Sequence, residues 1–244
     1  MFASITNLSS FVWMSRDEKD VINGFLSRIM GGYDIKIYHA PYQVNYGDVC
    51  GGAVIHKKWA LTSAHCGSNH TYIRIGSSYR LGGPKVNITS HHIHPMFGLK
   101  HKFDFDVQLL ETLRSLRITP TIAAIPISTG KCGDEIYVAG WGYPAEKGDY
   151  QNILHQVKIK TVPLKECQKV NNTWYNNSLT PRMFCAGGWG QDACQGDSGG
   201  AAVSYGKLVG ISSFGFGCGR KLPGVYTNVS DSNIRKWIRY YTGV

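Results

Sequence analysis

Short β-branched and aromatic runs, separated by turns, fill most of this chain and restrict its fold more than any other feature. The runs include residues 54–55, 72–75, 135–139, 153–161 and 208–212. The 29 glycines and 9 prolines are spread along the chain in short clusters, as frequent turns require. This pattern predicts an all-β barrel or sandwich. The sequence has no βαβ alternation and no internal repeat.

Both ends of the chain depart from this pattern. Residues 1–28 carry a charged patch at positions 16–20 and end at Arg28, so we interpret them as a leader and propeptide preceding a domain of residues 29–244. Residues 1–14 are only partly apolar and make a poor signal peptide. Near the C-terminus, Ser230 or Asp231 can cap a helix. One face of that helix would carry Ile234, Trp237, Ile238 and Tyr241.

The formal net charge of +10 favours acidic partners. The chain has no block of five Lys or Arg and no nucleic-acid-binding motif, so we expect a soluble basic protein without nucleic acid. No apolar run is long enough to span a bilayer. The basic residues are concentrated in residues 67–103, which contain no Asp or Glu.

Seven cysteines occur, none in a C-x-x-C pair, which argues against a zinc ribbon or a thioredoxin-type site. Six paired cysteines would indicate an oxidising compartment and hence secretion. Sequons for N-glycosylation fit that compartment but are weak support. They begin at Asn69, Asn87, Asn171, Asn176 and Asn228.

The strongest chemical signal is the run Cys194-Gln195-Gly196-Asp197-Ser198-Gly199-Gly200. A serine flanked by glycines lies in a tight turn, where a substrate carbonyl can approach the backbone closely. The N–H groups of Gly196 and Ser198 could then point at one oxyanion. The alternative is a turn that happens to contain serine.

Two further motifs supply partners for such a serine. Leu61-Thr62-Ser63-Ala64-His65-Cys66 offers an imidazole as the base. Asp106, in the run of residues 104–110, offers a carboxylate to orient the imidazole. Strand alternation would put Phe105 and Val107 on one face and Asp106 and Gln108 on the other. Alone, His65 could be an ordinary surface or core histidine, and Asp106 a turn or cap residue.

Together these motifs resemble the trypsin-like serine proteases of the chymotrypsin family (peptidase family S1), and the match extends from residue 29 to the C-terminal helix. The chain is also similar in style to arthropod digestive trypsins, including those known as mite allergens. Three more motifs carry the resemblance: the Arg28-Ile29-Met30-Gly31-Gly32 start, Gly140-Trp141-Gly142 and Pro223-Gly224-Val225-Tyr226. The resemblance implies two six-stranded antiparallel β-barrels with a C-terminal α-helix and an active site between the barrels.

The resemblance also implies roles for individual residues. His65, Asp106 and Ser198 would be the catalytic triad, with Gly196 and Ser198 forming the oxyanion hole. Asp192 would form the floor of a pocket for substrate Arg or Lys. The other substrate-binding positions would be Ser213, Gly215, Gly217 and Gly224. Cleavage between Arg28 and Ile29 would free an ammonium that pairs with Asp197, so the uncut chain is expected to be an inactive zymogen.

Three disulfides follow from the same resemblance, and they are Cys50–Cys66, Cys167–Cys185 and Cys194–Cys218. Cys132 is left without a partner, and we favour a buried free thiol over an intermolecular bridge. We expect no cofactor and no metal, calcium included, because residues 67–103 lack the paired acids that a hard cation needs. The expected partners are protein or peptide substrates, an activating protease and protein inhibitors of proteases. We expect a monomer.

Several residues depart from the family pattern. Each departure replaces one residue: Gln108 stands in place of a small residue, Ala201 in place of Pro, Ser212 in place of Val, Phe214 in place of Trp and Met30 in place of Val. The departures raise an alternative, in which the chain is a protease-like binding or inhibitory paralogue with little turnover. The intact triad motifs argue against that alternative.

Overall fold

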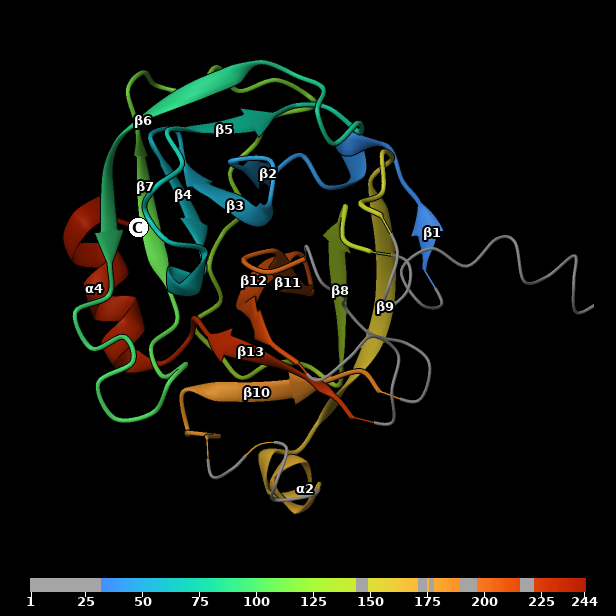
Figure 1. The fold of residues 1–244 in the computed structure, drawn as a ribbon, viewed down its shortest axis with the longest axis vertical. Coiled ribbons are helices and arrows are strands. Elements are labelled where there is room, and N and C mark those ends of the chain that lie inside the picture. The colour runs from blue at the N-terminus through green and yellow to red at the C-terminus, as the bar shows by residue number, and fades with distance from the viewer. Residues whose placement is uncertain (1–31, 144–148, 171–174, 176–177, 189–196, 216–221) are drawn as a thin grey trace, which may run out of the picture.

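The computed structural model describes residues 32–143, 149–170, 175, 178–188, 197–215 and 222–244. Two antiparallel β-barrels lie side by side (Figure 1). The first half of the chain builds one and the second half builds the other. The predicted two-barrel fold is therefore confirmed.

The first barrel closes in the order β2-β3-β4-β7-β6-β5. Its interior is filled by aliphatic side chains and Tyr46, which strand alternation turns inward. The strands are β2 (Gln43–Tyr46), β3 (Cys50–His56), β4 (Trp59–Thr62), β5 (Tyr72–Ile75), β6 (Lys85–Ile93) and β7 (Gln108–Thr112).

The second barrel closes because β9 pairs with both β8 and β10. The remaining pairings run β10-β13-β12-β11-β8, and the short strand β1 (Tyr33–Asp34) adds to the outside of β9. The strands are β8 (Glu135–Gly140), β9 (His155–Val162), β10 (Met183–Ala186), β11 (Ala201–Ser204), β12 (Lys207–Phe214) and β13 (Gly224–Asn228).

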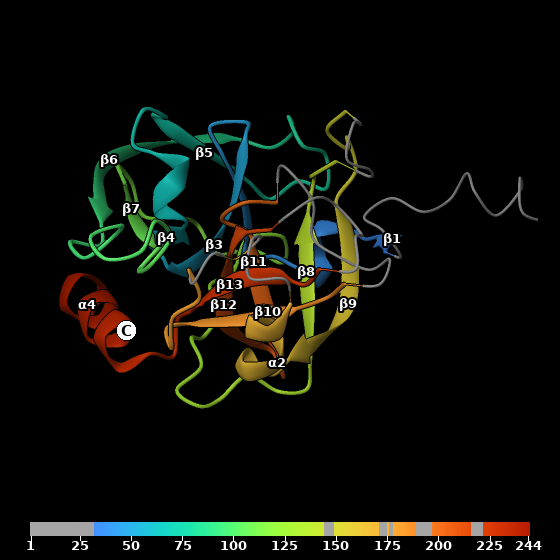
Figure 2. The same ribbon diagram turned by 60° about the horizontal axis from the view of Figure 1, so that its bottom comes forward.

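The C-terminal helix α4 (Ser232–Thr242) follows the second barrel but packs beside the first (Figures 1 and 2). Asp231 caps it, accepting hydrogen bonds from the N–H groups of Asn233 and Ile234, as the sequence predicts. Ile234 and Ile238 are fully buried in a cluster that also takes residues from both barrels. The helix therefore ties the two barrels together.

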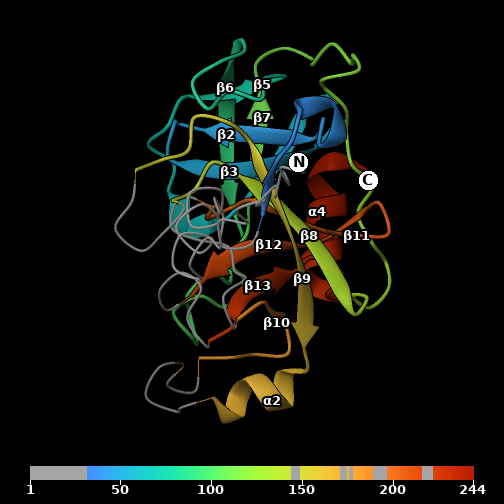
Figure 3. The ribbon, with the colours of Figure 1, turned by 90° about the vertical axis from the view of Figure 1, so that its right-hand side faces the viewer.

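The other helices are short. Those with bounds inside the described ranges are η1 (Ile37–His39) and η2 (Ala64–Cys66), both 3-10 helices, and α2 (Leu164–Lys169), which projects below the second barrel (Figure 3). Among the described residues, no helix combines the length and apolar character needed to cross a membrane.

Two of the three expected disulfides lie within the described residues, and both are present: Cys50–Cys66 and Cys167–Cys185. The expected Cys194–Cys218 pair lies outside these residues. Cys132 forms no disulfide with any described residue. Burial raises the pKa of its thiol to about 11, so little reactive thiolate forms at neutral pH.

Candidate active site

His65 lies in η2, directly after β4 leaves the first barrel. Two constraints fix this turn. The Cys50–Cys66 disulfide ties it to β3, and the Ser63 hydroxyl donates to the carbonyl of Ser212 in the second barrel at 2.6 Å. The imidazole is therefore held at the junction of the barrels with its side chain 24% exposed, which leaves it accessible to substrate.

Asp106 lies in a turn, not in the strand that the sequence suggested. Phe105 has a φ of 55° and its carbonyl accepts from Val107 N at 2.7 Å, so β7 begins only at Gln108. Phe105 and Val107 still share one side of the segment, as expected, because both enter the core between the barrels. The turn leaves the carboxylate of Asp106 directed at His65.

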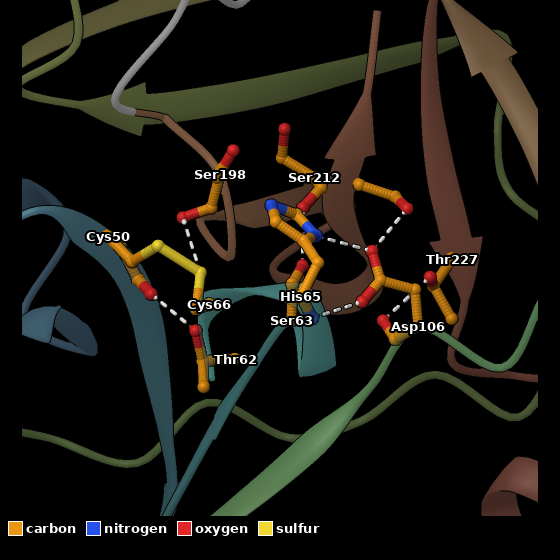
Figure 4. A network of polar contacts seen from close by, with 11 residues as sticks. Cys50, Thr62, Ser63, His65, Cys66, Asp106, Ser198, Ser212 and Thr227 are labelled. Atoms are coloured by element: carbon orange, nitrogen blue, oxygen red, sulfur yellow. Dashed lines mark hydrogen bonds and ion pairs between the residues drawn. A yellow bond between two sulfur atoms is a disulfide. The ribbon is translucent and has the colours of Figure 1, made fainter. Parts of the chain in front are cut away.

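The carboxylate of Asp106 is completely buried and receives three hydrogen bonds (Figure 4). Its Oδ1 accepts from the backbone N–H of His65 at 2.9 Å, and its Oδ2 accepts from His65 Nδ1 at 2.7 Å and from Ser213 Oγ at 2.5 Å. A carboxylate can only accept, so Nδ1 carries a proton and the lone pair is left on Nε2. This is the tautomer that a general base requires.

Ser198 faces the imidazole from the second barrel (Figure 4). Its carbonyl accepts from Gly51 N in β3 at 2.8 Å, which fixes the turn across the barrel interface. Gly199 has a φ of +79°, and a Cβ there would lie 2.2 Å from Thr62 Oγ1, so only glycine fits. The Ser198 hydroxyl makes no hydrogen bond to His65 here. Such contacts often tighten only when substrate binds.

Asp197, the neighbour of Ser198, is buried and accepts from Gly142 N at 2.9 Å. A Cβ on Gly140 would lie 2.0 Å from the Asp197 carboxylate, and one on Gly142 would lie 2.6 Å from it. The Gly-Trp-Gly motif thus has a physical reason, because these two glycines leave room for the buried Asp197 carboxylate beside the Ser198 turn.

The remaining predicted site residues divide into two groups. Gly215 and Gly224 face each other, since a Cβ on Gly215 would lie 3.7 Å from Gly224 Cα, and Ser213 binds Asp106 as described above. The others lie outside the described residues: Arg28, Ile29, Asp192, Gly196 and Gly217.

The structure also identifies contacts that the sequence did not indicate. Thr227 Oγ1 in β13 donates to the backbone carbonyl of Asp106 at 2.9 Å. Asp104, two residues before Asp106, is buried and binds Arg182 through Nε at 2.8 Å and NH2 at 2.7 Å. Thr180 Oγ1 adds a third bond to Asp104 at 2.8 Å. Both ends of the Asp106 turn are thus anchored to the second barrel.

Burial alone would raise the pKa of Asp104, but the hydrogen bonds from Arg182 and Thr180 outweigh it and lower the pKa below its usual value. A carboxyl with a lowered folded-state pKa stabilises the fold above the unfolded value, about 3.9, and loses that contribution as pH falls through the lowered value. The ion pair between the barrels should therefore stabilise the protein at neutral pH and not in strong acid.

Asp104→Ala is expected to reduce the free energy of unfolding by about 2–3 kcal/mol near neutral pH, since Arg182 and Thr180 lose their acceptor and Arg182 is only partly exposed. Denaturant titrations of both proteins at about pH 7 and about pH 3 measure the difference, which should shrink in acid. Lys169→Ala breaks an exposed ion pair with Glu166 and serves as a control with little effect. A deficit that does not vary with pH would contradict the assignment.

Three of the unusual residues, Gln108, Ala201 and Phe214, do not disturb these contacts. Gln108 is buried and donates to His91 Nδ1 at 3.0 Å, and Ala201 fills the core between the barrels. Phe214 stacks on Phe103 with ring centroids 4.6 Å apart, and Phe103 lies edge-on to His65 at 5.9 Å. An aromatic wall beside the imidazole therefore remains.

Comparisons with known proteins agree with this fold. The family model described as Trypsin matches residues 29–238. Vitellin-degrading protease of Bombyx mori is 37% identical over 227 residues, covering 86% of this chain and 84% of that protein. Trypsin 5G1 of Aedes aegypti is 32% identical over 236 residues, covering 89% and 86%. The solved structure of neuropsin, a serine protease expressed in the limbic system of mouse brain, superposes with a TM-score of 0.78 at 27% identity, covering 86% and 97%.

Proposed function

Because this chain belongs to the trypsin family of serine endopeptidases, we propose that it cleaves peptide bonds after Arg or Lys with a Ser198–His65–Asp106 triad. The observation that carries the proposal is the hydrogen-bonded pair of His65 Nδ1 and the buried Asp106 carboxylate, with Ser198 facing the same imidazole. Protein substrates follow from the family.

In this mechanism Ser198 Oγ attacks the scissile carbonyl carbon while His65 Nε2 takes the hydroxyl proton. The C–N bond then breaks, and His65 returns the proton to the leaving amine. Water then attacks the acyl-enzyme in the same way, with His65 again transferring the proton, and the acid product leaves as the Ser198 hydroxyl is restored. Asp106 stabilises the imidazolium that forms in each half. The N–H groups of Gly196 and Ser198 would bind the oxyanion, and one such donor contributes roughly 10²–10³-fold.

Specificity would come from Asp192 at the floor of the pocket. A partly desolvated carboxylate favours a cationic side chain, because an unpaired charge there is costly. Support comes from Gly215 and Gly224, which face each other and carry no side chains that would fill the space of a long substituent. Gly217 would form a further part of the wall.

Activation would follow cleavage between Arg28 and Ile29. The new ammonium would pair with the buried Asp197, which adjoins the nucleophile and would order the oxyanion hole. An activator that cuts after Arg28 would itself be trypsin-like. The two disulfides within the described residues support an oxidising compartment, and we propose that the protein is secreted.

The alternative, a binding paralogue with little turnover, has no specific observation in its favour. Gln108, Ala201 and Phe214 all lie outside the hydrogen bonds that join Asp106 to His65.

The test uses protein cut at Arg28–Ile29 and a fluorophosphonate that labels activated serines. We expect prompt labelling that is lost in Ser198→Ala and retained in Ser232→Ala, a change at an exposed serine. Profiling on a peptide library should then give cleavage after Arg and Lys, and Asp192→Ser should remove that preference. Absence of labelling would overturn the enzymatic proposal, whereas labelling with another cleavage preference would overturn only the specificity.

A further inference from the structure

A groove on the outside of the first barrel is lined by residues that the proposed function does not use. It lies between β5, β6 and the segment after β7, and its volume is about 380 Å³. Ile75 and Leu116 in its lining are buried core residues of the barrel, and Val86 and Ile122 pack against the same cluster. The apolar interior of the barrel thus reaches the surface at the floor of this groove.

Two arginines, Arg114 and Arg117, stand on the rim, and no Asp or Glu lines the groove. Both side chains are exposed, and neither forms an ion pair with a described residue. Lys85 also lines the groove, but its Nζ lies 4.0 Å from the centroid of the Tyr72 ring, and its charge interacts with the carboxylate of Asp48. By contrast, the nearby Glu111 is held by Lys58 at 3.9 Å and by Ser90 at 2.8 Å. The groove therefore combines an apolar floor with two arginines that form no ion pair with a described residue.

We propose that this cationic groove docks an extended acidic segment of a protein, with one or two large apolar side chains inserted onto the floor. Carboxylates flanking those side chains would lie near Arg114 and Arg117. The volume is at the small end of the roughly 300–1,000 Å³ of ligand sites, which suits one or two side chains rather than a whole ligand. The groove contains none of the triad residues, so docking here is separate from the choice of the bond that is cleaved.

An anionic glycan is the competing occupant, because it would also satisfy the rim charges. It offers no apolar side chain for the floor, so it would leave the exposed part of the barrel core in water. Burying apolar surface is favourable at about 25 cal/mol per Å², and the concave floor gives a peptide this gain in addition to the charge contacts. We therefore favour a peptide segment.

Asn87 adds a second constraint, because it lines the groove, is exposed and begins an Asn-Ile-Thr sequon. Carbohydrate on Asn87 would stand at the rim in a secreted protein. Thr89→Ala removes the sequon while keeping Asn87. Comparing this variant with the unchanged sequon shows whether carbohydrate on Asn87 blocks the groove to a peptide.

The test measures binding of a fluorescein-labelled peptide of about a dozen residues, rich in Asp and Glu around a Phe-Leu pair and lacking Arg and Lys. The full chain carries Ser198→Ala, so no turnover is needed and failure of the proposed function would not affect the result. We expect saturable binding that weakens at least about tenfold in Arg114→Glu/Arg117→Glu, since two attractions become repulsions. Replacing Phe-Leu by Ser-Ser in the peptide should also weaken binding at least about tenfold.

A matched control, Lys236→Glu/Arg239→Glu, makes the same change in net charge on an exposed part of α4 and should alter affinity by less than about twofold. The proposal is overturned if no saturation occurs below about 1 mM, if both double variants weaken binding equally, or if the Ser-Ser peptide binds as well as the original. It is also overturned if protein secreted from eukaryotic cells binds only when it carries Thr89→Ala, or if heparin binds the groove and the peptide does not.

Discussion

Asp106→Asn is expected to lower kcat/KM by about 10⁴-fold while leaving the fold intact. Both oxygens of Asp106 are acceptors, Oδ1 for the backbone N–H of His65 and Oδ2 for Nδ1 and Ser213 Oγ. An asparagine replaces one oxygen by an NH₂ group, so in either orientation a donor meets a donor. The orientation that spares the backbone N–H places NH₂ against Nδ1. The imidazole must then carry its proton on Nε2, where it cannot accept one from Ser198.

The measurement is steady-state hydrolysis by the activated variant, with thermal unfolding recorded in parallel. Ser213→Ala is the matched control, because it removes one donor to Oδ2 and leaves both bonds from His65. Its loss should be below about 10²-fold, in line with a single hydrogen bond to a charged group. If Asp106→Asn retained wild-type kcat/KM, the assignment of Asp106 would be wrong.

The sequence could predict those parts of the fold and site that depend on local patterns or on the family resemblance. Motifs around His65, Asp106 and Ser198 encode local turn chemistry, and the family resemblance supplied the Cys50–Cys66 and Cys167–Cys185 pairings that the structure contains. The Asp231 cap could be predicted because its acceptor and donors lie within three residues.

Other contacts could not be predicted from local patterns, because they join residues far apart in the chain. Thr227 contacts the carbonyl of Asp106 across 121 positions, and Thr180 and Arg182 reach Asp104 across 76 and 78. Such pairs depend on how one barrel packs against the other, and a threonine in a strand gives no local sign of its partner. The strand expected through Asp106 was wrong for a related reason. The positive φ of Phe105 is unusual outside glycine and is maintained by tertiary packing.

In the proposed activation, Asp197 would connect this packing to the new N-terminus. Its carboxylate is buried beside Ser198, in space left by Gly140 and Gly142. A buried carboxylate is expensive unless it is paired, and breaking such a pair typically costs about 3–5 kcal/mol. If the ammonium of Ile29 supplies the pairing charge, the same free energy separates the ordered from the unordered state of the nucleophile turn. It corresponds to a population ratio between roughly 10² and 5 × 10³.

Arg28→Gln should therefore leave the protein roughly 10²- to 5 × 10³-fold less active than wild type after both are treated with a trypsin-like activator. Lys19→Gln removes another cation of the proposed leader and should activate normally, which separates the effect of the cleavage site from that of charge in residues 1–28. Mass spectrometry of each product shows whether the chain was cut before Ile29. Asp197→Asn should be cut normally yet remain inactive, because the new ammonium then has no carboxylate to pair with. Full activity in uncut Arg28→Gln would show that this turn is ordered without the new N-terminus.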